Sequence, residues 1–304
     1  MLYIMKKMVF VAGLFLLLAA SCSKETVNEV INNTPEVAER DTLVPVHVHV
    51  NDFSIIQEDF PETRSNPQTP TASGVKAMTL AFYNGDTEVY KTTQLKDDAT
   101  QTNTFGEFEC ALPKGTYTMV VLGYGYFEGD VLTLTSPTQA AYTSDRPRET
   151  FAATEAVNIT TTQAVEVSTT LSRIVSRLHI VSTDGRTDDA ANVRVTFSAG
   201  GKAFNPATGL ATVNTGFNNT LSVGSVGTKF NSIAYLFLNT DEQTMDVTID
   251  VLNTAGTSIS HRELSGVPFK RNRSTKITGV LYSAPLSTSF HIDTDWLDEV
   301  IVGF

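Results

Sequence analysis

The sequence predicts an all-β protein with two antiparallel β-sandwiches in tandem. Runs of alternating apolar and polar residues recur along the chain, and the clearest of them is Met245 to Val251. Aromatic and β-branched residues are plentiful, whereas long stretches rich in Ala, Leu, Glu and Lys are absent. At 304 residues the chain is long enough for two domains, each with its own core.

The start of the chain has the features of an export signal. Lys6 and Lys7 precede an apolar run from Met8 to Ala20, and small residues then lead to Cys22. The apolar run is shorter than the roughly 20 residues that a membrane-spanning helix needs. A basic segment, a short apolar run and small residues, in this order, are typical of a cleaved secretory signal. We therefore expect residues 1–21 to be removed.

The position of Cys22 resembles the end of a bacterial lipoprotein signal, in which the cysteine thiol is acylated and the chain is cut just before it. The resemblance implies that the mature protein begins at Cys22 and is held in the outer membrane by the lipid attached there. The match departs from the family pattern at Ala19, where lipoprotein signals prefer Leu. A plain signal peptide with an incidental cysteine is the alternative interpretation.

A tether and a first strand are predicted after the signal. Residues 22–41 are polar, contain Pro35 and show no periodicity, which is typical of a flexible tether. Leu43 to Val50 then alternates, with four valines on one face, which predicts a β-strand. Because Pro45 lacks a backbone N–H, it favours an edge or terminal position for this strand.

Strand patterns follow one another closely from Val75 onward, and residues 42–163 are assigned to the first sandwich. Asn84-Gly85 is a hairpin signal, since both positions tolerate a positive φ. Phe108, Cys110 and Leu112 share one face of a predicted strand, so Cys110 is expected to be buried and unreactive. The Leu-Pro-x-Gly-x-Tyr turn that begins at Leu112 resembles a turn of transthyretin-like sandwiches.

The stretch from Gly123 to Gly129 carries three aromatic residues, Tyr124, Tyr126 and Phe127. Its glycines superficially resemble a phosphate-binding loop, but the third glycine falls one place late and no helix pattern follows. Such aromatic residues commonly cover the edge of a sandwich. An exposed cluster can instead contact sugar rings, so these three residues are the candidate glycan contacts.

Residues 164–304 are assigned to the second sandwich, with the domain boundary near residue 163. The apolar residues of Leu171 to Leu178 have helical spacing, but their strand-like flanks favour one long strand with a bulge. One turn of helix is the alternative there. Asn205 to Val226 is rich in Asn, Gly and Thr and is expected to be a poorly structured connection.

Three stretches together resemble the FimB-type fimbrial anchor and fimbrillin-like proteins of the type V fimbriae of the Bacteroidales. They are Val267 to Gly279, Leu171 to Leu178, and Phe290 to Trp296. The resemblance implies two transthyretin-like sandwiches, a surface lipoprotein of the outer membrane, and assembly with other fimbrial subunits by strand exchange. In such exchange an incoming strand fills a groove in a neighbouring subunit. The chain lacks the Cys-Pro start of the closest anchors, and Thr63-Arg64-Ser65 resembles stretches of polymerising relatives. Anchor, stalk and tip roles therefore stay open, with the anchor role preferred.

Two arginines and the C-terminal residues are the candidate assembly sites. Cleavage after Arg40 by an Arg-specific surface protease would free the chain from its lipid and keep the strand Leu43–Val50. Cleavage after Arg64 would remove that strand and open a groove with unpaired backbone groups. The candidate donor-strand residues at the apolar chain end are Val300, Ile301, Val302 and Phe304.

Charge and motif content argue against several other functions. The formal net charge of −11 and the pI of about 4.9 disfavour binding to nucleic acid. The five histidines form no His-Glu-x-x-His pattern and no Gly-x-Ser-x-Gly is present, so we predict no enzyme, no cofactor and no metal site. The leading interpretation is a lipid-anchored fimbrial subunit that supports adhesion to a host or bacterial surface ligand. The alternative is a surface glycan-binding lipoprotein.

Overall fold

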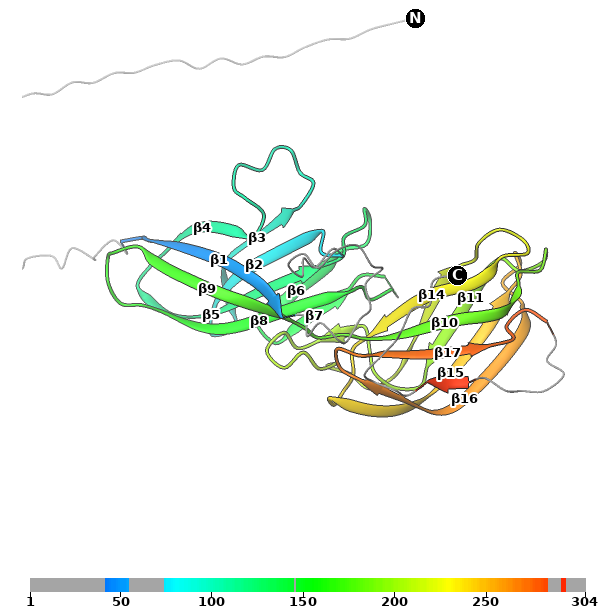
Figure 1. Cartoon of the computed structure of the whole chain (residues 1–304). Coiled ribbons are helices and arrows are strands. Elements are labelled where there is room, and N and C mark those ends of the chain that lie inside the picture. Colours follow the sequence, from blue (N-terminus) through cyan, green and yellow to red (C-terminus); the bar gives the residue numbers. More distant parts are fainter. Residues whose placement is uncertain (1–41, 55–73, 145, 284–290, 294–304) are drawn as a thin grey trace, which may run out of the picture. The chain divides into compact units, whose positions relative to one another are not determined.

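The computed structural model describes residues 42–54, 74–144, 146–283 and 291–293 (Figure 1). Over these residues the chain forms eighteen β-strands and no helix. The strands make four sheets, in which most neighbouring strands run antiparallel. The all-β, sandwich-like fold predicted from the strand patterns is therefore confirmed. The signal peptide and the tether lie outside the described residues.

The first half of the chain forms a seven-stranded sheet in the order β3-β2-β5-β8-β9-β1-β4. Its strands are β1 (Val44–Ser54), β2 (Ala77–Asn84), β3 (Thr87–Leu95), β4 (Glu107–Leu112), β5 (Gly115–Tyr124), β8 (Thr150–Ile159) and β9 (Val165–Arg173). The side chain of Gln94 in edge strand β3 links the two ends of the sheet. Its Nε2 donates to the Glu107 carbonyl of β4 at 2.6 Å, and its Oε1 accepts from the Gly106 amide at 2.8 Å. The sheet therefore curves around a single apolar core.

The second half forms two four-stranded sheets, β14-β10-β17-β18 and β13-β11-β15-β16. Their strands are β10 (Ser176–Gly185), β11 (Asn192–Phe197), β13 (Phe217–Ser222), β14 (Lys229–Leu236), β15 (Glu242–Leu252), β16 (Ser258–Lys270), β17 (Ser274–Gly279) and β18 (His291–Asp293). Both sheets contribute to one core cluster. At its centre the ring of Phe197 lies 5.2 Å from that of Phe217 and 6.0 Å from that of Phe269.

A three-stranded sheet connects residues of the two halves. It contains β6 (Leu132–Ser136), β7 (Gln139–Tyr142) and β12 (Ala203–Phe204), in the order β12-β7-β6. Phe204 stacks on Phe237 with 4.3 Å between ring centroids, and Tyr142 packs on the same ring at 6.5 Å. These rings belong to a third apolar cluster that also includes Tyr83 and Leu122 of the seven-stranded sheet.

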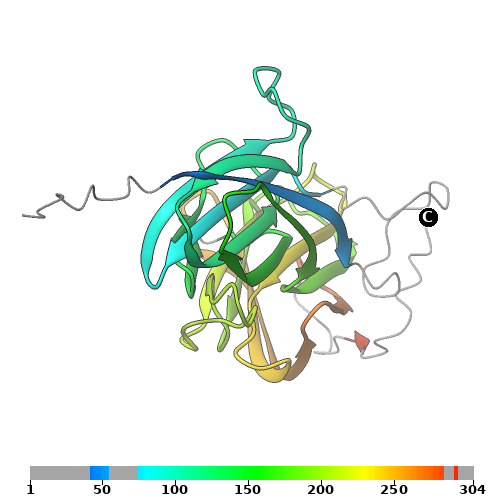
Figure 2. The same ribbon diagram turned by 90° about the vertical axis from the view of Figure 1, so that its left-hand side faces the viewer.

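The predicted edge position of the first strand is wrong, because β1 has a neighbour on each side. It pairs antiparallel with β4 and parallel with β9, and it is drawn in blue in Figure 2. Pro45 is opposite Ala111 of β4, whereas pairing with β9 starts only at Val46. The proline therefore sits at the start of the strand, where its missing N–H interrupts no ladder with β9.

The single bulged strand expected over Leu171 to Leu178 is also wrong. The chain leaves β9 at Arg173 and enters β10 at Ser176, and the two strands belong to different sheets. Ile174 and Val175, which separate them, are buried in the third cluster. By its pairing β9 belongs with the strands of residues 44–159, although the predicted domain boundary near residue 163 stays a prediction.

The expectation of a poorly structured connection at Asn205 to Val226 is corrected by strand β13. It pairs with β11 over six residues, from Asn192 opposite Ser222 to Phe197 opposite Phe217. Polar residues alternate with Phe217, Asn219 and Leu221, and an Asn on the inner face hid this pattern in the sequence. Asn219 is only 1% exposed, so it occupies a core position that an apolar residue normally fills.

The Asp184 carboxylate fixes the segment that follows β17. Asp184 accepts backbone hydrogen bonds from Leu281 at 2.8 Å, Tyr282 at 2.9 Å and Ser283 at 2.8 Å. Burial of Asp184 raises its pKa, but the three amide donors outweigh this effect and hold the pKa below the ordinary value of 3.8. The contacts fix Leu281 and Tyr282 against the core, 0% and 6% exposed.

Replacement of Asp184 by Ala should lower the free energy of unfolding at pH 7 by about 1–3 kcal/mol, because three amides lose a charged acceptor. A depressed folded-state pKa gives stability that is present above the unfolded pKa and is lost as pH falls through the folded value. The difference between Asp184→Ala and wild type should therefore be constant from pH 7 to pH 5 and shrink below about pH 4.

Urea unfolding across this pH range measures the effect. Asp189→Ala is the control, since Asp189 lies on the connection that follows β10 and is exposed. A pH-independent difference for Asp184→Ala would show that the lost packing, and not the charge, accounts for the destabilisation.

Candidate functional site

Strand β1 occupies a slot between two walls, β4 on one side and β9 on the other. Residues Val44 to His49 pair with β4, and Val46 to Ser54 pair with β9, with a register shift between Val50 and Asp52. On its inner face Val44, Val46 and Val48 are 0%, 0% and 1% exposed. Without β1, both walls would present unpaired backbone groups along a row of apolar cavities.

The opposite face of β1 carries polar residues. His47 is half-buried and His49 is exposed, and the His49 Nδ1 contacts a carboxylate oxygen of Glu107 on β4. The part of the chain that the structure describes contains no group of three or more His, Cys, Asp or Glu placed to hold a metal ion. Both histidines lie on the face of β1 opposite its core valines.

Several residues predicted to act in anchoring and assembly lie outside the described residues. They are Cys22, Arg40, Arg64, Val300, Ile301, Val302 and Phe304. Arg64 belongs to the connection between β1 and β2, and the four apolar residues follow β18 in the sequence. Their roles stay predictions.

The predicted aromatic cluster divides into a buried and an exposed part. Tyr124 is 2% exposed, and its hydroxyl lies 3.2 Å from the Thr79 hydroxyl. Burial raises the pKa of Tyr124, and its hydrogen bonds oppose that rise. Tyr126 is half-buried, whereas Phe127 is 58% exposed. Of the three candidate glycan contacts, Tyr124 therefore acts as a core residue in this structure.

The Phe127 ring packs against the ion pair between Arg148 and Asp130. The Arg148 guanidinium lies 4.0 Å from the centre of the Phe127 ring. Arg148 also donates to Asp130 Oδ2 from Nε at 3.1 Å and from Nη2 at 2.6 Å. Asp130 is 8% exposed, and its other oxygen, Oδ1, is buried without a hydrogen-bond partner. An exposed ring beside polar groups is an arrangement that can contact a sugar.

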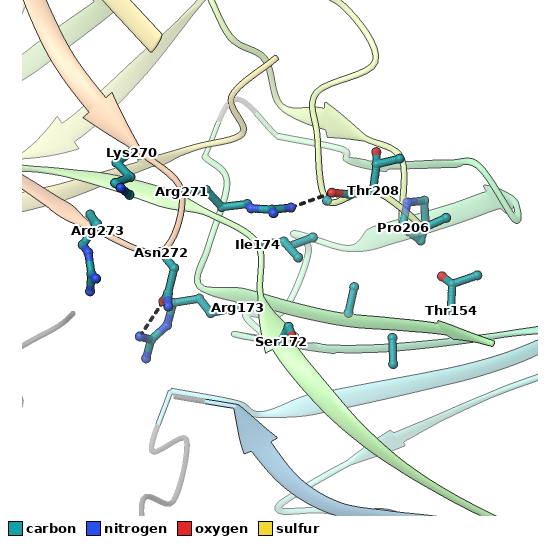
Figure 3. A pocket seen from close by; sticks show the side chains of 14 residues that line it. Thr154, Ser172, Arg173, Ile174, Pro206, Thr208, Lys270, Arg271, Asn272 and Arg273 are labelled. Atoms are coloured by element: carbon teal, nitrogen blue, oxygen red, sulfur yellow. Dashed lines mark hydrogen bonds between the residues drawn. The ribbon is translucent and has the colours of Figure 1, made fainter. Parts of the chain in front are cut away.

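A basic pocket of about 520 Å³ lies where β9 leads into β10 (Figure 3). We call it the junction pocket. It is lined by Ala152, Ala153, Thr154, Ser172, Arg173, Ile174, Pro206, Ala207, Thr208, Gly209, Lys270, Arg271, Asn272 and Arg273. The lining holds four cationic residues and no carboxylate. Its volume is within the range of small-molecule sites.

Two of the stretches that resemble fimbrial proteins meet in the junction pocket. The tight turn between β16 and β17 has Asn272 at a φ of 60°, a conformation that Asn tolerates better than most residues. The Asn272 amide donates to the Val175 carbonyl at 2.8 Å, and the Arg177 amide donates to the Arg273 carbonyl at 3.1 Å. Arg173 Nη1 donates to Asn272 Oδ1 at 3.2 Å.

The loop after β12 forms another wall of the pocket. Asn205 closes it, since its carbonyl accepts from the Gly209 amide at 2.8 Å and its Oδ1 accepts from the Ala207 amide at 2.9 Å. Gly209 has a φ of 69°, and a Cβ there would lie 2.7 Å from the Ile174 side chain. Glycine is therefore required for this close approach. Arg271 Nη1 fixes the loop by donating to the Thr208 carbonyl at 2.6 Å, as Figure 3 shows.

Carboxylates outside the lining pair with cations of the pocket. Arg173, with a side chain 1% exposed, contacts Glu149 at 2.7 Å. Burial lowers the pKa of Arg173, and Glu149 opposes that effect. At the rim, Lys270 contacts Glu242 at 2.5 Å and Arg271 contacts Asp241 at 2.8 Å.

Lys270 to Arg273 lie in one of the stretches that resemble fimbrial proteins, and no site is predicted there from the sequence. This basic run could have indicated an anion site. The pocket's remaining lining comes from residues 152–154, 172–174 and 206–209, which no sequence spacing brings together.

Cys110 is partly buried, and burial raises the pKa of its thiol to about 11, which keeps it protonated and unreactive. Among the residues described, no helix is long and apolar enough to cross a membrane.

Several solved structures of low sequence identity are similar to this one. A candidate adhesin from Bacteroides ovatus matches with a TM-score of 0.51 and 10% identity, over 87% of this chain and 97% of that one. A candidate polysaccharide-binding protein from Bacteroides thetaiotaomicron matches with a TM-score of 0.47 and 11% identity, over 82% and 96%. The fimbrial anchor protein Mfa2 from Porphyromonas gingivalis matches with a TM-score of 0.42 and 11% identity, over 82% and 95%.

At these identities the comparisons show the fold alone. Fimbrial proteins and candidate adhesins are among the structural neighbours, as the resemblance inferred from the sequence implies. No functionally curated protein matches the sequence significantly. The profile of the family of unknown function DUF6562 matches residues 53–302, which is most of the chain, and the protein therefore belongs to that family.

Proposed function

We propose that this protein is a lipid-anchored subunit of a surface fimbrium, which is held in the outer membrane through Cys22 and joins other subunits by exchange of a β-strand. The role is structural and adhesive, not enzymatic. The observation that supports it best is the position of β1 between β4 and β9, with its inner valines in the core. Shared fold with a candidate adhesin is consistent with a place at the cell surface.

Loss of β1 would leave a groove between β4 and β9 that another β-strand can fill with a gain in stability. Each fully buried valine stabilises the fold by roughly 1.5–3 kcal/mol, and Val44, Val46 and Val48 are all buried. The exposed walls would also carry unpaired N–H and C=O groups from β4 and β9. A donor strand restores the backbone ladder and fills the apolar cavities with every second side chain.

The C-terminal residues have the pattern that such a donor needs. In an extended conformation Val300, Val302 and Phe304 share one face, as Val44, Val46 and Val48 do in β1. In the proposed assembly they occupy the slot of a neighbouring subunit whose own β1 has been removed by cleavage after Arg64. An anchor resists that cleavage and keeps β1, and we propose the anchor role for this chain.

The N-terminus of the surface-mature protein should therefore be Cys22, as measured by mass spectrometry of protein released from outer membranes. A form that begins at Ser65 lacks β1 and should polymerise when mixed with chains that carry an intact C-terminus. Deletion of Val300–Phe304 should prevent this polymerisation, because it removes the donor strand.

Light scattering and electron microscopy of the two purified forms test the assembly step. The matched control replaces Val300, Val302 and Phe304 by Ser, which keeps the chain length and removes the apolar face. A surface-mature protein that begins at Ser65 would instead identify a stalk subunit. Polymers that persist without residues 300–304 would contradict the donor assignment.

Replacement of Cys22 by Ser should abolish incorporation of a fatty-acid analogue and leave the protein unprocessed or soluble. The fold should survive, because Cys22 precedes every strand of the described structure. Metabolic labelling followed by membrane fractionation measures the change, and Cys110→Ser is the control. Equal labelling of wild type and Cys22→Ser would contradict the lipoprotein assignment.

A second candidate function, binding of a surface glycan, is supported by the exposed ring of Phe127. Under this alternative Phe127→Ala should reduce binding on a glycan array without a change in melting temperature. Under the fimbrial proposal it should leave both unchanged. Tyr124→Ala/Tyr126→Ala should lower stability by roughly 3–5 kcal/mol in either case, since Tyr124 is a buried aromatic residue. Val131→Ala, at a neighbouring residue that is 45% exposed, is the control.

A further inference from the structure

We propose that the junction pocket binds carboxylates and that its occupant is the acidic segment 295–299 of the same chain. The proposal does not depend on the fimbrial role. Three observations carry it: the charge of the pocket, the direction in which β18 runs, and the charge of the residues that follow β18.

The pocket offers accessible cations in a concave, polar setting. The side chains of Lys270 and Arg271 are 40% and 32% exposed. Their present partners, Glu242 and Asp241, are 66% and 67% exposed. Ion pairs this exposed stabilise a protein by about 1 kcal/mol or less, so another carboxylate can share or replace them. Ser172, Thr154 and Thr208 add polar atoms to the lining.

The register of β17 and β18 directs the C-terminal segment towards the pocket. The two strands run antiparallel, with Thr278 opposite His291 and Lys276 opposite Asp293. β18 therefore runs towards the start of β17 at Ser274, which directly follows the pocket residue Arg273. Figure 1 shows the arrowhead of β18, in red, at the end that faces this direction.

The length of the segment fits the distance to be covered. At about 3.3 Å per residue in an extended chain, Asp295 lies roughly 7 Å beyond Asp293, and Glu299 lies roughly 20 Å beyond it. The pocket residues Lys270 to Arg273 precede Lys276 by three to six positions. An extended segment that continues past Ser274 thus brings its carboxylates to the rim of the pocket.

Charge complementarity selects this segment as the occupant. Asp295, Asp298 and Glu299 lie within five residues, and no Lys or Arg follows Lys276 in the sequence. The pocket lining has the opposite charge, since it contains four cationic residues and no carboxylate. Planar guanidinium groups such as that of Arg271 bind carboxylates through paired hydrogen bonds.

Trp296, which is the only tryptophan of the chain, provides a direct probe inside the segment. In the full mature chain its fluorescence should be protected from acrylamide. The variant Asp295→Asn/Asp298→Asn/Glu299→Gln should lose that protection, because each exposed pair changes the docking equilibrium about two- to fivefold and three are removed. One molar salt should have a similar effect on wild type.

Charge reversal in the pocket tests specificity. Lys270→Glu/Arg271→Glu should expose Trp296 as the amide variant does, and adding Asp298→Lys/Glu299→Lys should restore the protection. Lys91→Gln, which removes a cation of similar exposure on β3, is the matched control and should change nothing. The amide variant alters no described residue, so it tests docking even if the pocket variant does not fold.

Other outcomes would overturn the proposal. Equal quenching of Trp296 in wild type and in the amide variant would show that the segment does not dock through its carboxylates. Protection that rises with protein concentration would indicate the segment of a second copy. Oligogalacturonate that binds the intact chain as tightly as a chain ending at Asp293 would identify the pocket as a site for an acidic glycan.

Discussion

The turn between β16 and β17 fixes how the chain passes from the seven-stranded sheet into the second pair of sheets. The Asn272 amide bonds to the Val175 carbonyl between β9 and β10, and Arg173 reaches Asn272 from the end of β9. Arg173 is almost fully buried, and its charge is paired with that of Glu149 at 2.7 Å. A turn more than 90 residues away in sequence thus determines where β10 begins.

This dependence explains why two separate sequence stretches together resemble one family. Leu171 to Leu178 contains the connection from β9 to β10. Val267 to Gly279 contains the turn between β16 and β17, which is hydrogen-bonded to that connection. The pattern of Leu171 to Leu178 is weak alone, because its buried residues are divided among three core clusters. The same contacts create the junction pocket. They bring Lys270, Arg271 and Arg273 of the turn close to the segment between β9 and β10.

The fold class could be predicted from the sequence because half-buried strands alternate visibly, as at Met245 to Val251. The central position of β1 could not be predicted, since Pro45 suggested an edge and a parallel partner leaves no local signal. β13 was hidden by the buried Asn219 in its inner row. The candidate strand slot was predictable from its valines, whereas the junction pocket depends on contacts such as Arg173 with Glu149, which tertiary packing alone creates.

The pairing of β1 has a mechanical consequence under the proposed attachment of the chain at its N-terminus. The described fold starts with β1, in which Val44 to His49 pair with β4 on one side and Val46 to Ser54 pair with β9 on the other. Tension applied along the axis of this strand loads both rows of hydrogen bonds in shear, so the bonds share the force. They cannot open one after another, as they do when a strand is peeled from its end. The first element of the fold is therefore the one best placed to withstand a steady pull.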